Sequence, residues 1–236
     1  AGLPGRTPQE RLPRLIEAAD RLGIERICVF MGMSFVATPS PEVLRAQNDE
    51  VLAAIEHHHD RVFGFCYVSG QHVEASLREI ERCVKDGPMV GIKLWVARRC
   101  HEPELDPIIE AAARLKAVIF QHTWIKTDGT QLAGESTPMD LVQLARRHPQ
   151  TTIICGHAGG TWEPGIRAVR STPNLMLEIG GSDPTSGLVE MAVRELGAQR
   201  VVFGSDAAGR SYGLQLAKVL GARIPDEPRT LMIGGK

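Results

Sequence analysis

Seven short apolar runs, rich in β-branched residues, recur along this chain of 236 residues. Most of them are apolar almost throughout rather than alternating, as is typical of strands that are covered on both faces. The runs are IERICVF (24–30), VFGFCYV (62–68), VGIKLWV (90–96), AVIFQHT (117–123), TIICGHA (152–158), NLMLEIG (174–180) and RVVFGSD (200–206). We therefore predict seven buried strands.

Segments with helical spacing of apolar residues lie between these strands. They cover residues 7–22, 40–58, 72–84, 102–115, 137–148 and 186–197. Three of the segments open with a hydroxyl residue followed by proline, which is typical of a helix start, at Thr7-Pro8, Ser40-Pro41 and Thr137-Pro138. Strand and helix therefore alternate, and repeating units of roughly 30 residues indicate parallel strands joined by right-handed crossovers.

Two α/β architectures satisfy this alternation, an open doubly wound sheet and a closed TIM-like (β/α)8 barrel. The open sheet is expected to carry a phosphate-binding glycine motif, and the sequence contains neither GxGxxG nor GxxxxGK[ST]. Barrels of this length are routinely single domains. We therefore predict a TIM-like barrel that forms one domain over residues 1–236, with seven of its strands readable.

Composition narrows the class of protein further. The formal net charge is -1 and no run is rich in lysine and arginine, so neither nucleic acid nor a membrane surface is an expected partner. The five cysteines are widely spaced and form no CxxC motif, which favours buried free thiols in a reducing compartment. Since no stretch of about 18 apolar residues or apolar signal core occurs, we predict a cytoplasmic protein.

Ionisable side chains stand at the ends of five consecutive predicted strands: Lys93, His122, His157, Glu178 and Asp206. Each one alone is explained at least as well by a solvated residue at a strand exit. Five in succession are not, because charged residues are rarely buried unless they are paired or bind a ligand. Catalytic residues of parallel barrels lie at the carboxyl ends of several strands. We therefore predict a site at this rim.

Tryptophans follow the same strand ends, at Trp95, Trp124 and Trp162. Aromatic walls with a few convergent polar groups are typical of a small-molecule site, although a role in capping the core explains each tryptophan equally well. Two imidazoles and a carboxylate from separate strands suit a divalent ion such as zinc. Such an ion would polarise a substrate oxygen and lower the pKa of bound water.

The segments FQHTW, ICGHAGG and FGSDAAG, with GIKLW upstream, resemble the amidohydrolase superfamily. The similarity is to the amidohydrolase-related group that includes amino-carboxymuconate-semialdehyde decarboxylase, and it covers nearly the whole chain. The resemblance implies that His122 and Asp206 are metal ligands. It also implies that His157 is a catalytic histidine beside the metal-bound water. From its chemistry alone, Asp206 could bind the ion, accept the proton of its water, or do both.

The same resemblance implies an HxH pair on a first barrel strand, which the seven readable strands do not include. We expect that an N-terminal segment of the native protein carries it. The HxH at His57-His58-His59 ends a predicted helix, so favourable interaction with the helix C-terminus is a sufficient explanation for it.

Substrate-binding roles are predicted for four residues near the rim. Lys93 and Arg210 are expected to hold a substrate carboxylate, with Trp95 and Trp124 as walls. Glu178 is expected to orient a ligand from behind. For Lys93 two alternatives stay open, carbamylation as in binuclear relatives and a Schiff base with a carbonyl substrate.

Three functions remain in competition. The first is a metal-dependent hydrolase or non-oxidative decarboxylase that acts on a small carboxylated cyclic or aromatic substrate. The second is a Schiff-base lyase that uses Lys93, and the third is a noncatalytic barrel that binds a small molecule. Because relatives are often dimers, a homodimer is possible on resemblance alone.

Overall fold

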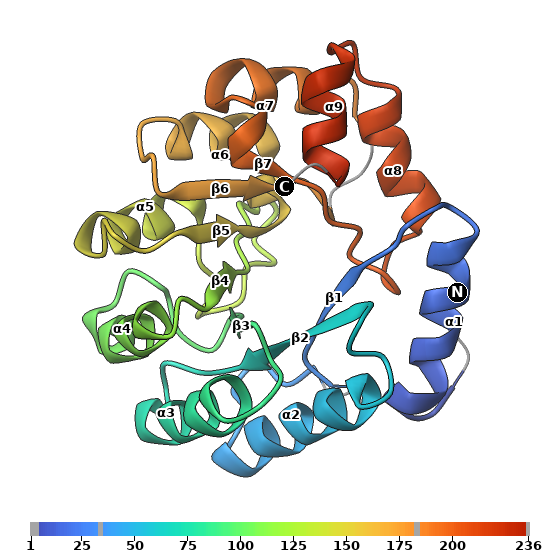
Figure 1. Cartoon of the computed structure of the whole chain (residues 1–236). Coiled ribbons are helices and arrows are strands. Elements are labelled where there is room, and N and C mark those ends of the chain that lie inside the picture. The colour runs from blue at the N-terminus through green and yellow to red at the C-terminus, as the bar shows by residue number, and fades with distance from the viewer. Residues whose placement is uncertain (1–4, 33–34, 182–184, 235–236) are drawn as a thin grey trace. The chain divides into compact units, whose positions relative to one another are not determined.

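The computed structural model describes residues 5–32, 35–181 and 185–234. All seven predicted strands form, and Figure 1 shows helices alternating with them along the chain. The strands follow one another in chain order from β1 to β7. Their bounds are β1 (Ile27–Phe30), β2 (Val62–Tyr67), β3 (Gly91–Leu94), β4 (Val118–Gln121), β5 (Ile153–Cys155), β6 (Leu175–Glu178) and β7 (Val201–Val202).

All six predicted helical segments contain a helix. Within the described residues the helices are α1 (Pro8–Asp20), α2 (Pro41–Ile55), α3 (Val73–Ile80), α4 (Asp106–Arg114), α5 (Pro138–Arg147), α6 (Trp162–Val169), α7 (Leu188–Leu196), α8 (Tyr212–Leu220) and α9 (Asp226–Ile233). Of the three that spacing did not identify, α6 contains Pro164 and Gly165, two residues that mask a helical pattern.

The predicted helix starts are confirmed in atomic detail. The hydroxyl of Thr7 accepts the backbone N–H of Glu10 at 3.2 Å, and that of Ser40 accepts the N–H of Val43 at 3.4 Å. At α5, Thr137 and Asp140 form a reciprocal capping box. These local bonds satisfy N–H groups that a helix terminus leaves without partners, which explains why a short sequence motif predicts the boundary.

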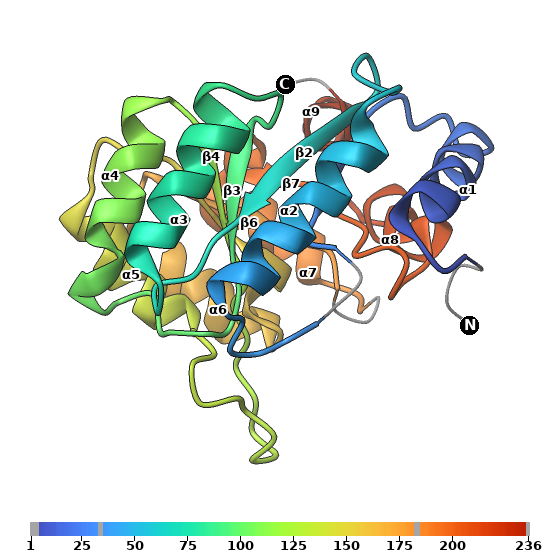
Figure 2. The same cartoon turned by 90° about the horizontal axis from the view of Figure 1, so that it is seen from below.

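The chain divides into two compact units, the first comprising the described residues up to Phe120 together with Leu132–Gly134. In this unit β1, β2 and β3 pair in parallel, with Phe30 opposite Phe65 and Tyr67 opposite Lys93. Figure 2 shows α2 and α3 running along this group of strands. A Cβ on Gly64 would lie 3.0 Å from Ile55 of α2, so the sheet packs closely on that helix.

The second unit comprises Gln121–Gln131 and the described residues from Glu135 onward. Here β5, β6 and β7 pair in parallel, with Cys155 opposite Leu177 and Glu178 opposite Val202. Helix α6 packs between α5 and α7, and Figure 1 shows α5 and α6 beside β5 and β6. The register places the carboxyl ends of these strands at one edge of the sheet. The polar residues of the candidate site come at the ends of these strands or shortly after them in the sequence.

Four of the cysteines are buried free thiols, as predicted: Cys66, Cys83, Cys100 and Cys155. The prediction is wrong for Cys28, which is exposed. This residue belongs to β1, an end strand of the sheet, and a residue on an end strand lacks cover from a second neighbour. Within the described part of the chain, no helix is long and apolar enough to cross a bilayer.

Candidate active site

Two histidines from adjacent strand ends lie together in the second unit. His122 directly follows β4, and His157 lies in the short 3-10 turn Gly156–Gly159 that follows β5. Their ring centroids are 4.9 Å apart at an interplanar angle of 67°. Both side chains are nearly buried, with 9% and 8% of each residue exposed. The structure therefore brings together the two imidazoles that strand-end reasoning selected.

The GHAGG segment bends sharply to place His157. His157 and Ala158 have φ values of 61° and 48°, in the left-handed region, and Gly160 follows at 72°. A Cβ on Gly160 would lie 2.5 Å from Nε1 of Trp124, so a side chain there would displace the indole. Glycine is required at this position because it allows both the left-handed backbone and the close approach of Trp124. The Trp124 ring lies 5.6 Å from that of His157.

Glu178, the last residue of β6, holds this bend in place. Its Oε2 accepts the backbone N–H of His157 at 2.7 Å, and its Oε1 accepts the N–H of Gly180. His157 Nδ1 lies 3.2 Å from the carbonyl oxygen of Gly180. Because a carbonyl only accepts, Nδ1 carries the proton in this bond, and Nε2 is the basic nitrogen of the neutral ring. Glu178 therefore positions the backbone and ring of His157.

A second buried carboxylate, Glu135, holds His122. His122 Nε2 lies 3.0 Å from Glu135 Oε1, and Lys126 Nζ lies 3.0 Å from Oε2 of the same carboxylate. Only 2% of Glu135 is exposed. Since an ionised carboxylate only accepts, Nε2 is the donor, and Nδ1 is the basic nitrogen of the neutral His122 ring. Sequence reasoning missed Glu135, because it lies in a polar loop with no motif and reaches His122 only in the fold.

Asp206 and Arg210 follow β7 in the same unit. Asp206 is exposed and has a φ of 51°, and its carbonyl accepts the backbone N–H of Arg210 at 2.8 Å. Arg210 Nε donates to the carbonyl of Gly181 at 2.9 Å, which ties this loop to the one beside His157. Among the described residues, no three or more His, Cys, Asp or Glu side chains are arranged to hold a metal ion.

Lys93 and Trp95 belong to the first unit. Lys93 is buried in β3, and its Nζ lies 4.1 Å from the ring centroid of Phe120 and 5.2 Å from that of Phe30. These cation–π contacts offset part of the cost of burying the ammonium group. Trp95 packs edge-on against Phe35 at a centroid distance of 5.9 Å. Lys93 therefore places a buried cation among aromatic rings.

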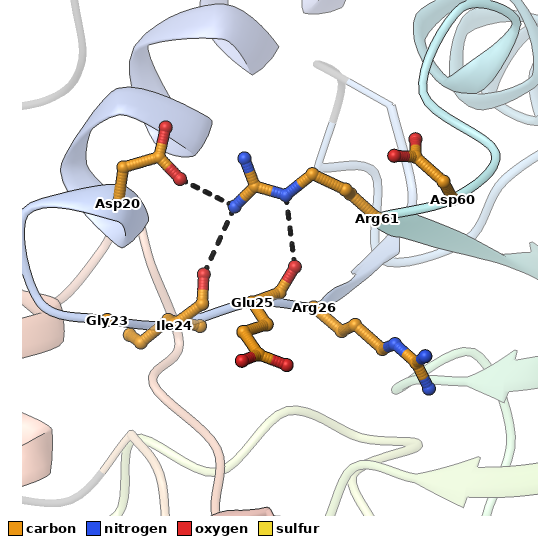
Figure 3. Close-up of a pocket in the computed structure, with 7 residues that line it drawn as sticks. All are labelled: Asp20, Gly23, Ile24, Glu25, Arg26, Asp60 and Arg61. Atoms are coloured by element: carbon orange, nitrogen blue, oxygen red, sulfur yellow. Dashed lines mark hydrogen bonds and ion pairs between the residues drawn. The ribbon is translucent and has the colours of Figure 1, made fainter.

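A separate cavity of about 450 Å³ lies at the amino ends of β1 and β2 (Figure 3). Arg61 spans its wall, pairing with Asp20 at 2.6 Å and donating to the carbonyls of Ile24 and Glu25. This end is opposite the carboxyl ends where a parallel barrel carries its chemistry. The residues that line the cavity are Asp20, Gly23, Ile24, Glu25, Arg26, Asp60 and Arg61.

Parallel strands followed by buried imidazole and carboxylate groups define a barrel-type α/β protein with a site at the strand ends. The Amidohydrolase family model matches residues 4–231, and the chain belongs to the amidohydrolase family. This match confirms the resemblance that the strand-end motifs carry.

Similar proteins agree with this membership. The curated 2-amino-3-carboxymuconate-6-semialdehyde decarboxylase of Dictyostelium discoideum is 28% identical over 80 residues, which is 33% of this chain and 22% of that relative. The structure of 5-carboxyvanillate decarboxylase from Sphingomonas paucimobilis has a TM-score of 0.75 at 16% identity, covering 94% of this chain and 80% of that one.

A second solved structure is dihydroxybenzoic acid decarboxylase from Polaromonas sp. JS666, with bound manganese and the inhibitor 2-nitroresorcinol. Its TM-score is 0.73 at 19% identity, with 94% of this chain and 83% of that chain covered. At these identities the likeness shows the fold, and it confirms the predicted TIM-like barrel class.

Proposed function

We propose that this protein catalyses the non-oxidative decarboxylation of a small aromatic carboxylic acid. The observation that carries the proposal is the His122–His157 pair, with ring centroids 4.9 Å apart after adjacent strands. Membership of the amidohydrolase family supports it, as do the decarboxylase names of the similar proteins. Those names favour decarboxylation over hydrolysis as the reaction.

The chemistry requires one proton at a defined carbon. When the bond between the ring carbon and the carboxylate breaks, its electron pair stays on the ring carbon and takes up a proton, and carbon dioxide leaves. In our proposal protonated His157 delivers that proton from Nε2, which then becomes the basic nitrogen of a neutral ring. The Gly180 carbonyl at Nδ1 and the Glu178 carboxylate, 3.7 Å from Nδ1, stabilise the charged ring before transfer.

Side chains around His157 suit an aromatic acid. Trp124 lies against both imidazoles, with its ring nearly parallel to that of His122 at 20° and 6.1 Å, and it would offer a flat apolar wall. Arg210, anchored through Nε at Gly181, keeps a guanidinium group in this region for the substrate carboxylate. Substrate-binding roles for Lys93 and Trp95 belong to the same proposal.

A divalent ion is part of the proposal, with His122 and Asp206 as ligands. The donor set fits in kind, because imidazole and carboxylate groups bind both zinc and manganese. The described residues gather no group of three such donors, so the remaining ligands are left unassigned. When bound, such an ion polarises substrate oxygens. A cytoplasmic location and a homodimer complete the proposal.

The proposal is tested by incubating the manganese- or zinc-loaded protein with 2,6-dihydroxybenzoate and 5-carboxyvanillate. We expect carbon dioxide release from at least one hydroxylated aromatic acid, together with the matching decarboxylated phenol. Release of an alcohol from an ester or lactone panel, with no carbon dioxide from any aromatic acid, would instead establish a hydrolase and overturn the proposal.

A further inference from the structure

The hydroxyl group of Tyr67 is a buried polar group without an assigned role. Tyr67 ends β2, is 0% exposed, and its hydroxyl has no hydrogen-bond partner among the described residues. Its backbone, in contrast, is fully engaged by Asn48, whose Oδ1 accepts the Tyr67 N–H at 2.7 Å and whose Nδ2 donates to the carbonyl at 3.1 Å. The residue is therefore held firmly while its hydroxyl stays unpaired, which is destabilising for a folded protein.

The surroundings of Tyr67 indicate what that hydroxyl could meet. Its ring belongs to a buried cluster with Met31 and Leu44, against which Phe30 and Trp95 pack. Its register partner on β3 is Lys93, whose ammonium group lies 5.2 Å from the Phe30 ring centroid. The Tyr67 cluster and the Lys93 ammonium group thus both lie against Phe30, at the carboxyl ends of two paired strands.

This combination suits an anionic aromatic ligand. Lysine supplies the charge that balances a carboxylate or phenolate, aromatic rings supply flat apolar contact, and a hydroxyl supplies directional recognition. Burial raises the pKa of the Tyr67 hydroxyl well above its ordinary value, so the group keeps its proton at neutral pH. It is then available as a donor.

We propose that the Tyr67 hydroxyl recognises the substrate, donating a hydrogen bond to an anionic oxygen of an aromatic acid whose charge Lys93 balances. This inference rests on the proposed decarboxylase function. It adds a substrate-recognition residue that strand-end reasoning did not select, because VFGFCYV is typical of core strand throughout. Without ligand the buried hydroxyl has no hydrogen-bond partner among the residues that the structure describes, which lowers stability. In our proposal an oxygen of the bound substrate supplies that partner.

The test compares Tyr67→Phe with wild type in two measurements. Thermal unfolding without ligand should show the variant to be as stable as wild type or more stable, because the substitution removes only an unpaired buried hydroxyl. Calorimetric titration with 2,6-dihydroxybenzoate should show affinity weakened by about 10- to 100-fold, as expected for a lost hydrogen bond to a charged group. Tyr212→Phe, the same change at the other tyrosine of the chain, should leave affinity unchanged.

Two results would overturn the inference alone. The first is a Tyr67→Phe protein that binds the acid as tightly as wild type does. The second is a Tyr67→Phe protein that unfolds at a clearly lower temperature, since the hydroxyl would then be bonded within the protein. A wild-type protein that binds no aromatic acid would overturn the proposed function, and with it the substrate proposed for Tyr67.

Discussion

The carboxylate of Glu178 accepts the backbone N–H of His157 at 2.7 Å, from the end of β6 to the turn after β5. A residue at a strand end thereby determines where its neighbour's imidazole lies, because the bond holds His157 at a φ of 61°. The sequence predicts both residues as strand-end groups, and the structure shows that one positions the other.

Replacing Glu178 with alanine should destabilise the protein. The change leaves the N–H groups of His157 and Gly180 without their acceptor, at about 1–3 kcal/mol for each buried group. Chemical denaturation measures the free energy of unfolding. Glu74→Ala is the matched control, because the Glu74 side chain is 93% exposed and its loss should change stability by less than about 0.5 kcal/mol. Equal stability of the two variants would contradict the role of Glu178.

Alanine at Gly160 should cost more than alanine at Gly129. Both glycines have positive φ, 72° and 77°, so both substitutions carry a backbone penalty of about 1 kcal/mol. Only at Gly160 would the new Cβ also meet Trp124, at 2.5 Å from Nε1, whereas nothing lies within 4 Å at Gly129. We expect the free energy of unfolding of Gly160→Ala to be lower than that of Gly129→Ala by about 1–3 kcal/mol. Thermal unfolding followed by tryptophan fluorescence measures the difference, and equal melting temperatures would refute the close packing.

Replacing Glu135 should abolish the preference of the neutral His122 ring for the tautomer protonated at Nε2. In wild type, ¹⁵N NMR should show a neutral His122 ring protonated at Nε2, because the Glu135 carboxylate accepts there at 3.0 Å. In Glu135→Ala this preference should disappear, with a stability loss of about 1.5–3 kcal/mol for a hydrogen bond to a charged group. Lys126→Met is the control that should keep the tautomer, because Lys126 contacts the other carboxylate oxygen. A wild-type ring protonated at Nδ1 would show that Glu135 does not hold it.

Acid should destabilise the first unit through Glu79. Burial acts to raise the pKa of Glu79, but hydrogen bonds from Arg82 and Asn48 outweigh it and hold the pKa below the ordinary 4.5. Because the folded pKa is the lower one, the stabilisation is complete above about pH 4.5 and is lost as pH falls through the folded pKa. Wild type should therefore lose stability more steeply below pH 4.5 than Glu79→Gln does, in denaturation measured from pH 7 to pH 3. Parallel profiles would contradict this.

Local patterns explain why the strands and helix starts could be predicted. A continuous apolar run such as residues 62–68 indicates a buried strand, and a pair such as Thr137-Pro138 indicates a helix start. His122 and His157 could be predicted for the same reason, because each directly follows such a run and parallel strands bring their carboxyl ends to one edge. These features depend on neighbours in sequence, so sequence reasoning reaches them.

Contacts between residues that lie far apart in the sequence could not be predicted from local patterns. Glu135 lies in a polar loop and becomes significant only through its 3.0 Å contact with His122. The unpaired hydroxyl of Tyr67 is invisible in a run that is typical of core strand. Asp206 is predicted to end the seventh apolar run, but β7 ends at Val202, and Asp206 lies beyond it with an exposed side chain and a left-handed backbone. In each case the deciding fact is a tertiary arrangement that no local pattern records.

The most direct test of the central claim, that His157 donates the proton, is the rate of carbon dioxide release by the metal-loaded His157→Asn variant. Asparagine tolerates the left-handed backbone at this position, so the variant should fold, and loss of the acid should slow turnover by about 100- to 10,000-fold. Metal content should stay at the wild-type level. A His157→Asn protein that releases carbon dioxide at the wild-type rate would contradict the account.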